Sequence, residues 1–83
     1  MRKLALIALM AFASPALAED VAMGTVLGTT KDEVKAALTD MGYETRKTKL
    51  EGGKIEVYFV RDGKMGEAYV DKQTGAVTKL KMK

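Results

Sequence analysis

Hydrophobic positions after residue 30 recur first at helical spacing. The apolar residues Val34, Ala37, Leu38 and Met41 are three or four positions apart or adjacent, so they form one face of a helix. Thr30 followed by Glu33 is typical of a capping box, in which each side chain satisfies a backbone N–H at the start of the helix. Gly42 can adopt the left-handed conformation that ends many helices. The pattern therefore predicts a helix over residues 31–41.

The spacing then changes to the alternation of β-strands, interrupted by turn residues. Strands are predicted over residues 43–50, 55–61, 64–71 and 76–82. Gly52-Gly53 and Asp62-Gly63 fit two-residue hairpin loops, and Gly75 fits a longer turn. Such short connections place consecutive strands side by side and antiparallel. The fold class is therefore α+β, with one helix packed on a three- to four-stranded antiparallel meander.

The Asp62-Gly63 turn also predicts the register of its hairpin, with Arg61 opposite Lys64. One face of the sheet then carries the apolar residues Ile55, Val57, Phe59, Ala68 and Val70, with Gly66 leaving room for the Phe59 ring. The other face carries Glu56, Tyr58, Val60, Met65, Glu67 and Tyr69. We expect the helix to pack on the first face and leave the second uncovered.

Two segments fit this scheme less well. Tyr43 and Leu50 differ in parity, so they cannot both face the helix unless the strand over residues 43–50 has a bulge or a frayed start. Residues 19–28 contain only Val21, Met23, Val26 and Leu27 as large apolar side chains. This leader is predicted to be an ordered segment or a poor edge strand.

The first 18 residues have the three parts of a secretory signal peptide. Arg2 and Lys3 are followed by an uncharged run of ten residues, then by Pro15 and the small–x–small sequence Ala16-Leu17-Ala18. A retained membrane anchor would need about 20 apolar residues. We therefore expect cleavage before Glu19, a domain over residues 19–83, a periplasmic or secreted location and no stable membrane anchor.

Removing this segment changes the overall charge and composition. Residues 1–18 hold two of the 14 basic residues and none of the 11 acidic ones, so residues 19–83 carry a net charge of only +1. A strongly basic, nucleic-acid-binding protein is thereby excluded. The chain has no cysteine, which excludes disulfides and makes the usual structural zinc sites unavailable.

Residues 19–83 also lack histidine, cysteine and serine, the side chains of most nucleophilic and acid–base catalysis. Asp32 and Glu33 are explained by their position in the first helical turn. Asp71 could suggest a calcium loop, but a single carboxylate fits a capped turn better than a metal site. We predict no enzymatic activity, no catalytic residues, and no metal or cofactor site.

The uncovered sheet face is the candidate partner surface, formed by Tyr58, Val60, Met65 and Tyr69 with Glu56 and Glu67 at its rim. It could bind a protein partner or a second copy of the chain. Alternatively, the leader covers part of it, or it is ordinary exposed apolar area. Lysines alternate along both outer strands, at Lys47 and Lys49 and at Lys79, Lys81 and Lys83. They discourage edge-to-edge association, or they form a basic margin for an anionic partner or membrane surface.

The order of these motifs resembles the PepSY domain. The most specific parts are Met41-Gly42-Tyr43 at the end of the helix and Tyr69 to Gly75 before the last strand. The resemblance implies a helix on an antiparallel sheet, no catalytic residues, and a module that restrains peptidases or acts as an extracytoplasmic binding or sensing module. It covers residues 28–80, and Lys72 stands where proline is frequent in the family. A structural or self-associating envelope protein is the alternative.

Overall fold

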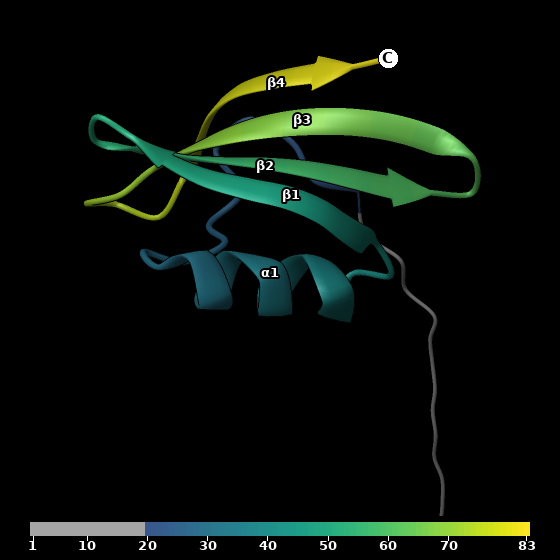
Figure 1. Ribbon diagram of the computed structural model, residues 1–83, viewed down its shortest axis with the longest axis horizontal. Helices are drawn as coiled ribbons and strands as arrows, with labels where there is room; N and C mark the ends of the chain where they lie inside the picture. The colour runs from purple at the N-terminus through teal and green to yellow at the C-terminus, as the bar shows by residue number, and fades with distance from the viewer. Residues whose placement is uncertain (1–19) are drawn as a thin grey trace, which may run out of the picture.

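The fold is known from a computed structural model, which describes residues 20–83. The predicted signal peptide at residues 1–18 lies outside the described residues. One helix is followed by a four-stranded antiparallel sheet in the order β1-β2-β3-β4 (Figure 1). The elements are α1 (Lys31–Asp40), β1 (Glu44–Glu51), β2 (Lys54–Arg61), β3 (Lys64–Asp71) and β4 (Val77–Met82). The predicted α+β class and meander are confirmed, and the sheet has four strands.

Helix α1 begins and ends close to the predicted residues. The Thr30 side chain accepts a hydrogen bond from the Glu33 N–H at 3.1 Å, as a capping box requires. The Glu33 carboxylate, however, accepts from the Thr29 N–H at 2.9 Å and not from that of Thr30. Gly42 has φ of 91° and follows the last turn. Val34 and Leu38 are fully buried, so the predicted apolar face packs on the sheet.

The β2–β3 hairpin has the predicted register at every position. Arg61 lies opposite Lys64, Phe59 opposite Gly66 and Ile55 opposite Val70. Asp62 and Gly63 have φ of 54° and 77°, which are the two positive values that a type I′ turn needs. This turn matches the twist of the two strands, so it sets which side chains face the helix.

A bulge resolves the parity conflict in β1. The register of β1 on β2 shifts between Thr45, which lies opposite Phe59, and Thr48, which lies opposite Val57. One extra residue on β1 is accommodated there, so the residues before and after it can face the helix. Tyr43 is buried as a result, whereas Leu50 keeps half of its surface exposed.

The leader packs on the same face of the sheet as the helix. Val21 and Leu27 belong to the buried core, and Val26 forms an isolated antiparallel bridge with Ala76 at the start of β4. The helix contacts β1 and β2, while the leader pairs with β4. Cover of the opposite face by the leader, one of the alternatives above, is therefore wrong.

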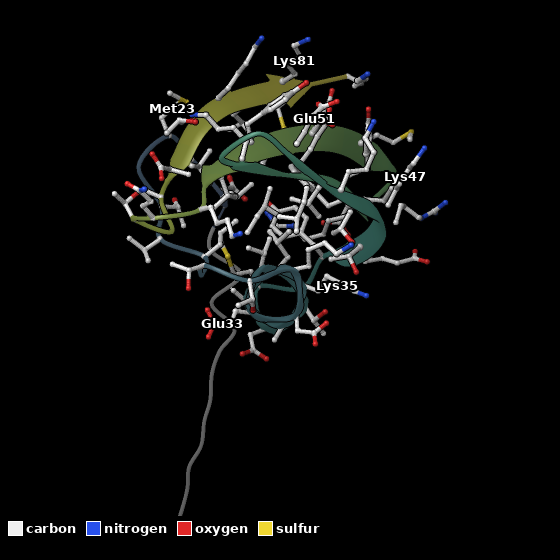
Figure 2. All side chains as sticks on the ribbon, turned by 60° about the vertical axis from the view of Figure 1, so that its left-hand side comes forward. Met23, Glu33, Lys35, Lys47, Glu51 and Lys81 are labelled. Carbon is white, nitrogen blue, oxygen red and sulfur yellow. The ribbon has the colours of Figure 1, made fainter. Side chains whose placement is uncertain are left out.

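Two faces follow from this arrangement. The helix-side face holds the core, and the open face, defined as the side of the sheet away from α1, is covered by no element within residues 20–83 (Figure 1). Figure 2 looks along α1 and shows Lys35 and Glu33 on the helix, while Lys47 and Lys81 project from the two outer strands. Within residues 20–83 no helix has the length and apolar composition needed to cross a bilayer.

Candidate functional site

The open face has a regular row of polar side chains across all four strands. Lys49 of β1 lies opposite Glu56 of β2, which lies opposite Tyr69 of β3, which lies opposite Lys79 of β4. Side chains at opposed positions of one face are close enough to interact. The Lys49 Nζ is 3.6 Å from Glu56 Oε1, and the Lys79 Nζ is 5.3 Å from the centre of the Tyr69 ring.

A second row lies beside the first. Tyr58 of β2 is opposite Glu67 of β3, which is opposite Lys81 of β4. Lys83, just beyond β4, places its Nζ 4.0 Å from Glu67 Oε1 and 6.0 Å from the centre of the Tyr58 ring. Each glutamate therefore has a tyrosine opposite it on the neighbouring strand and another tyrosine two residues away on its own strand. Lysines of β1 and of the C-terminal end of the chain lie at the outer sides of the two rows.

The four residues of the candidate partner surface share this face. Val60 lies opposite Met65 near the hairpin turn, next to the tyrosine–glutamate rows. Met65 is 48% exposed, while Val60 and the two tyrosines are half-buried. The four side chains lie on one face of the sheet, as predicted from their strand positions.

The prediction that Glu56 and Glu67 lie at the rim of the candidate partner surface is wrong. Glu56 and Glu67 were expected at the rim, but they are only 5% and 4% exposed, and both lie at the centre of the open face. Tyrosines beside them and lysines from the outer strands cover them. Strand alternation gives the face of a residue but not the direction in which long neighbouring side chains fold, so sequence reasoning could not detect this cover.

Hydrogen bonds hold Glu67 in its charged form. A side-chain hydrogen bond with Glu56 is the main cause that lowers the pKa of Glu67 from 4.5, assisted by hydrogen bonds from Tyr58 and Tyr69. Burial opposes this shift. The Tyr69 hydroxyl donates to Glu67 Oε2 at 3.1 Å. Glu56 Oε1, by contrast, is buried without a hydrogen bond, and the Lys49 Nζ lies 3.6 Å from it.

The carboxylates in turn keep the tyrosines neutral. The hydrogen bond to Glu67 is the largest cause that raises the pKa of Tyr58, and the one to Glu56 is the largest that raises the pKa of Tyr69. Both hydroxyls are therefore donors at any physiological pH. The open face presents apolar ring surface, neutral hydroxyls and ammonium groups, which suits binding more than proton transfer.

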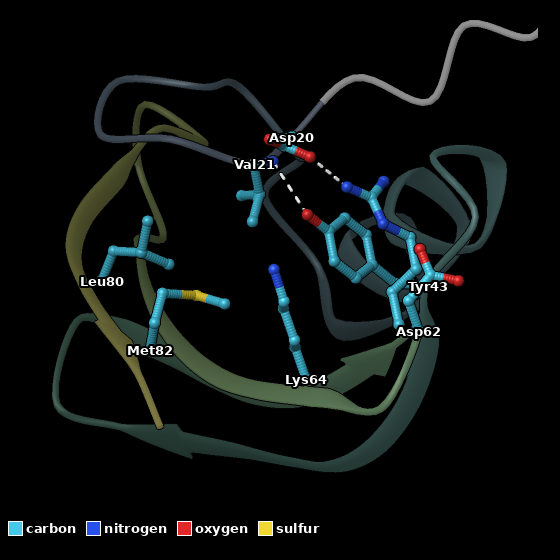
Figure 3. A pocket seen from close by; sticks show the side chains of 8 residues that line it. Asp20, Val21, Tyr43, Asp62, Lys64, Leu80 and Met82 are labelled. Carbon is cyan, nitrogen blue, oxygen red and sulfur yellow. Dashed lines mark hydrogen bonds and ion pairs between the residues drawn. The ribbon is translucent and has the colours of Figure 1, made fainter.

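A pocket of about 250 Å³ lies on the other side of the sheet, at the β2–β3 hairpin end (Figure 3). Its lining comes from the leader, the hairpin and β4: Asp20, Val21, Tyr43, Arg61, Asp62, Lys64, Leu80 and Met82. Arg61 forms one wall, since it pairs with Asp20, donates to the Met41 carbonyl at 2.9 Å and lies 4.2 Å from the centre of the Tyr43 ring. The Val21 N–H donates to the Tyr43 hydroxyl at 3.2 Å.

No cluster of three acidic side chains able to hold a metal ion occurs in the described part of the chain. Asp71 instead accepts from the backbone N–H groups of Gln73 and Thr74, at 2.7 and 3.3 Å. It caps the β3–β4 turn, as predicted, and Gly75 supplies φ of 79° there.

Comparison with known families gives a match over most of the chain. The sequence profile described as peptidase propeptide and YPEB domain matches residues 2–81, nearly the whole chain. The chain belongs to this family. No curated protein and no solved structure matches the chain at the significance required.

The peptidase propeptide and YPEB domain family is the PepSY family, so the resemblance inferred from the motifs is confirmed. Domains of this family are typically non-catalytic, propeptide-like or inhibitor-like modules, and they are commonly extracellular or periplasmic. The match describes a module associated with peptidases and assigns no particular residue to a partner.

Sequence reasoning also missed the pocket of this PepSY domain. Arg61, Tyr43 and Asp20 are far apart in the sequence and meet only because the leader folds over the hairpin end of the sheet. The register did place Arg61 and Lys64 side by side on the helix-side face. That placement was the one signal in the sequence that charged side chains lie beside the core, where the pocket is.

The lowered pKa of Glu67 predicts acid lability. Because the folded-state pKa lies below 4.5, the charged Glu67 stabilises the fold above that pH, and the contribution disappears as the pH falls through the folded-state value. We expect the urea midpoint of the protein to fall between pH 5 and pH 3, and to fall less in Glu67→Gln. Equilibrium urea unfolding at a series of pH values measures this.

Glu51→Gln is the matched control, because it removes an exposed carboxylate at the end of β1. It should keep the pH profile of the unmodified protein. Equal pH profiles of Glu67→Gln and the unmodified protein would show that Glu67 contributes nothing to acid unfolding.

Proposed function

We propose that residues 19–83 form a non-enzymatic binding module, exported to the periplasm or secreted, that modulates or inhibits a peptidase. The open face is its binding surface, with Tyr58, Val60, Met65 and Tyr69 as the contact residues. The observation that carries this proposal is an apolar and aromatic patch, uncovered within the described residues, on a domain of a family associated with peptidases.

The chemistry of the open face supports a protein partner. Aromatic side chains and methionine are enriched where proteins bind one another, and tyrosine contributes large contact area with a polar end. The two buried glutamates orient the tyrosine hydroxyls and the surrounding lysine side chains. The rings are therefore held in place before binding, which lowers the entropy lost on association.

Crosslinking in the producing cell tests the proposal. A photoreactive amino acid at Val60, on the open face, is expected to crosslink the protein to a peptidase in the extracytoplasmic fraction. The same group at Thr39, exposed on α1, is the matched control and should not. The captured peptidase, once purified, should cleave a fluorogenic peptide more slowly when the unmodified protein is added.

Substitution of the patch gives the second expected result. Tyr58→Ala combined with Tyr69→Ala should weaken inhibition by about tenfold or more, because aromatic residues at the centre of an interface carry much of its binding free energy. Met65→Glu tests the same face without removing the cover of the glutamates. Circular dichroism verifies that both variants fold.

Other outcomes reject the proposal. A crosslink from position 60 to a second copy of the chain, with a dimer in light scattering, would assign the face to self-association. A crosslinked partner that is not a peptidase, or inhibition unchanged in both variants, would also contradict it.

A further inference from the structure

The pocket at the hairpin end has the exposed Lys64 beside apolar side chains. Its apolar lining comes from Val21, Leu80 and Met82, with the Tyr43 ring beside them. Figure 3 shows the Lys64 side chain extending between Met82 and Tyr43, with its ammonium directed into the pocket. Such a site favours a ligand that has an apolar body and a negative charge at one end.

The other charged groups of the pocket leave the Lys64 ammonium uncompensated. Asp20 is paired with Arg61. The Asp62 carboxylate lies on the opposite side of the Tyr43 ring from the Lys64 ammonium (Figure 3). Among residues 20–83, Lys64 has no ion pair. A carboxylate that enters the pocket would therefore meet a cation that is not already neutralised.

The free edge of β4 adds groups that recognise a peptide backbone. Lys83 donates its N–H to the Met65 carbonyl of β3. Because backbone groups alternate in direction along an antiparallel strand, those of Leu80 and Met82 point away from β3. Among residues 20–83, the backbone hydrogen bonds between the leader and β4 are those of Gly24 and Thr25 with Val77. An extended peptide can bond to the rest of the edge, as in strand addition.

The size of the pocket limits what can enter. Sites for drug-sized ligands have volumes of about 300–1,000 Å³. The pocket, at about 250 Å³, is smaller and suits one amino-acid side chain with its terminal carboxylate.

We propose that this pocket binds the C-terminal residue of a peptide. An apolar last side chain packs against Val21, Leu80 and Met82, and the terminal carboxylate pairs with the Lys64 ammonium. The preceding peptide backbone lies beside the outer edge of β4. This site is on the side of the sheet opposite to the proposed partner surface, so either assignment can fail without the other.

The experiment is a titration followed by amide chemical shifts of the purified exported protein. The probe is acetyl-Gly-Gly-Leu with a free carboxylate, compared with the same peptide carrying a C-terminal amide and with hexanoate. The free peptide is expected to shift the amides of Tyr43, Leu80 and Met82. Loss of the carboxylate should weaken binding by up to about fivefold, the upper range for a partly exposed ion pair.

Lys64→Met keeps the apolar stem of the side chain and removes its charge, so it should weaken binding of the free peptide to the level of the amide. Lys72→Met, in the exposed β3–β4 turn at the other end of the sheet, is the matched control and should bind as the unmodified protein does.

Several results would each overturn the proposal. They are no shifts in the pocket, equal binding of the free and amidated peptides, or hexanoate binding as tightly as the peptide. The last would mean that the backbone edge of β4 takes no part. Shifts confined to Tyr58 and Tyr69 would also overturn it, while leaving the proposed function intact.

Discussion

Phe59→Ala is expected to leave most of the protein unfolded at 25 °C. The Phe59 ring is fully buried, and its centre is 4.9 Å from that of the Tyr43 ring, edge to face. Truncating a buried phenylalanine to alanine costs about 3–5 kcal/mol. A single core in a domain below about 70–80 residues rarely supplies more than about 3–5 kcal/mol in total. With no disulfide to compensate, this one substitution removes most of the stability.

Urea unfolding followed by circular dichroism measures this effect. Met65→Ala is the matched control, since Met65 lies on the same hairpin but faces away from the core and is 48% exposed. It is expected to change the free energy of unfolding by less than about 0.5 kcal/mol. If Phe59→Ala kept a cooperative transition within a few tenths of a molar of the unmodified midpoint, the core would not depend on this ring.

Gly66→Ala is expected to be the second most damaging change, although it adds only one methyl group. A Cβ at residue 66 would lie 2.6 Å from two atoms of the Phe59 ring and 2.8 Å from Met82 Sδ. The Met82 side chain is half exposed and can move aside, but the buried Phe59 ring cannot. Overpacking of this kind costs about 1–3 kcal/mol. Thermal and urea unfolding of the variant should both show the loss.

Gly53→Ala is the control for Gly66→Ala. A Cβ at residue 53 would have no neighbouring atom within 4 Å, and the backbone there does not have positive φ. That variant should be neutral or slightly more stable, because alanine restricts the unfolded chain. Gly66→Ala should also cost less when Phe59 is replaced by leucine, since the two positions are in contact. Equal costs in both backgrounds would mean that the Phe59 ring is not the obstacle.

Local signals were enough for the secondary structure and for the hairpin. Asp62-Gly63 requires two positive φ values, which few other residue pairs accept, so the turn and the register of β2 on β3 follow from it. The place of Gly66 under Phe59 follows from the same register. The capped start of α1 is also local, although the Glu33 carboxylate bonds one residue earlier than a capping box predicts.

The leader shows where local reasoning ended. Four apolar residues without clear spacing could belong to an ordered segment or to an edge strand. In the structure Val21 and Leu27 complete the core beside the helix, and one bridge at Val26 joins the leader to the sheet. A short helix covers only part of a four-stranded sheet, and this need for cover cannot be seen in the leader alone.

The residues of the candidate partner surface could be predicted from the sequence, but the burial of the glutamates among them could not. Strand alternation placed Tyr58, Val60, Met65 and Tyr69 on one face. The position of the glutamates beneath this face depends on long side chains that fold inward from β1 and from the end of β4. Their direction is set by electrostatic attraction across strands, which acts only after the sheet has formed.

For this PepSY domain, the amino-acid pattern alone is sufficient for the elements, their antiparallel order, the two faces of the sheet and the family. These depend on interactions between residues close in the chain or on strict two-residue alternation. The burial of Glu56 and Glu67, the position of the leader and the pocket around Lys64 depend on residues far apart in the sequence. Such contacts form through side-chain packing in three dimensions, and no local pattern encodes which distant side chain fills a given space.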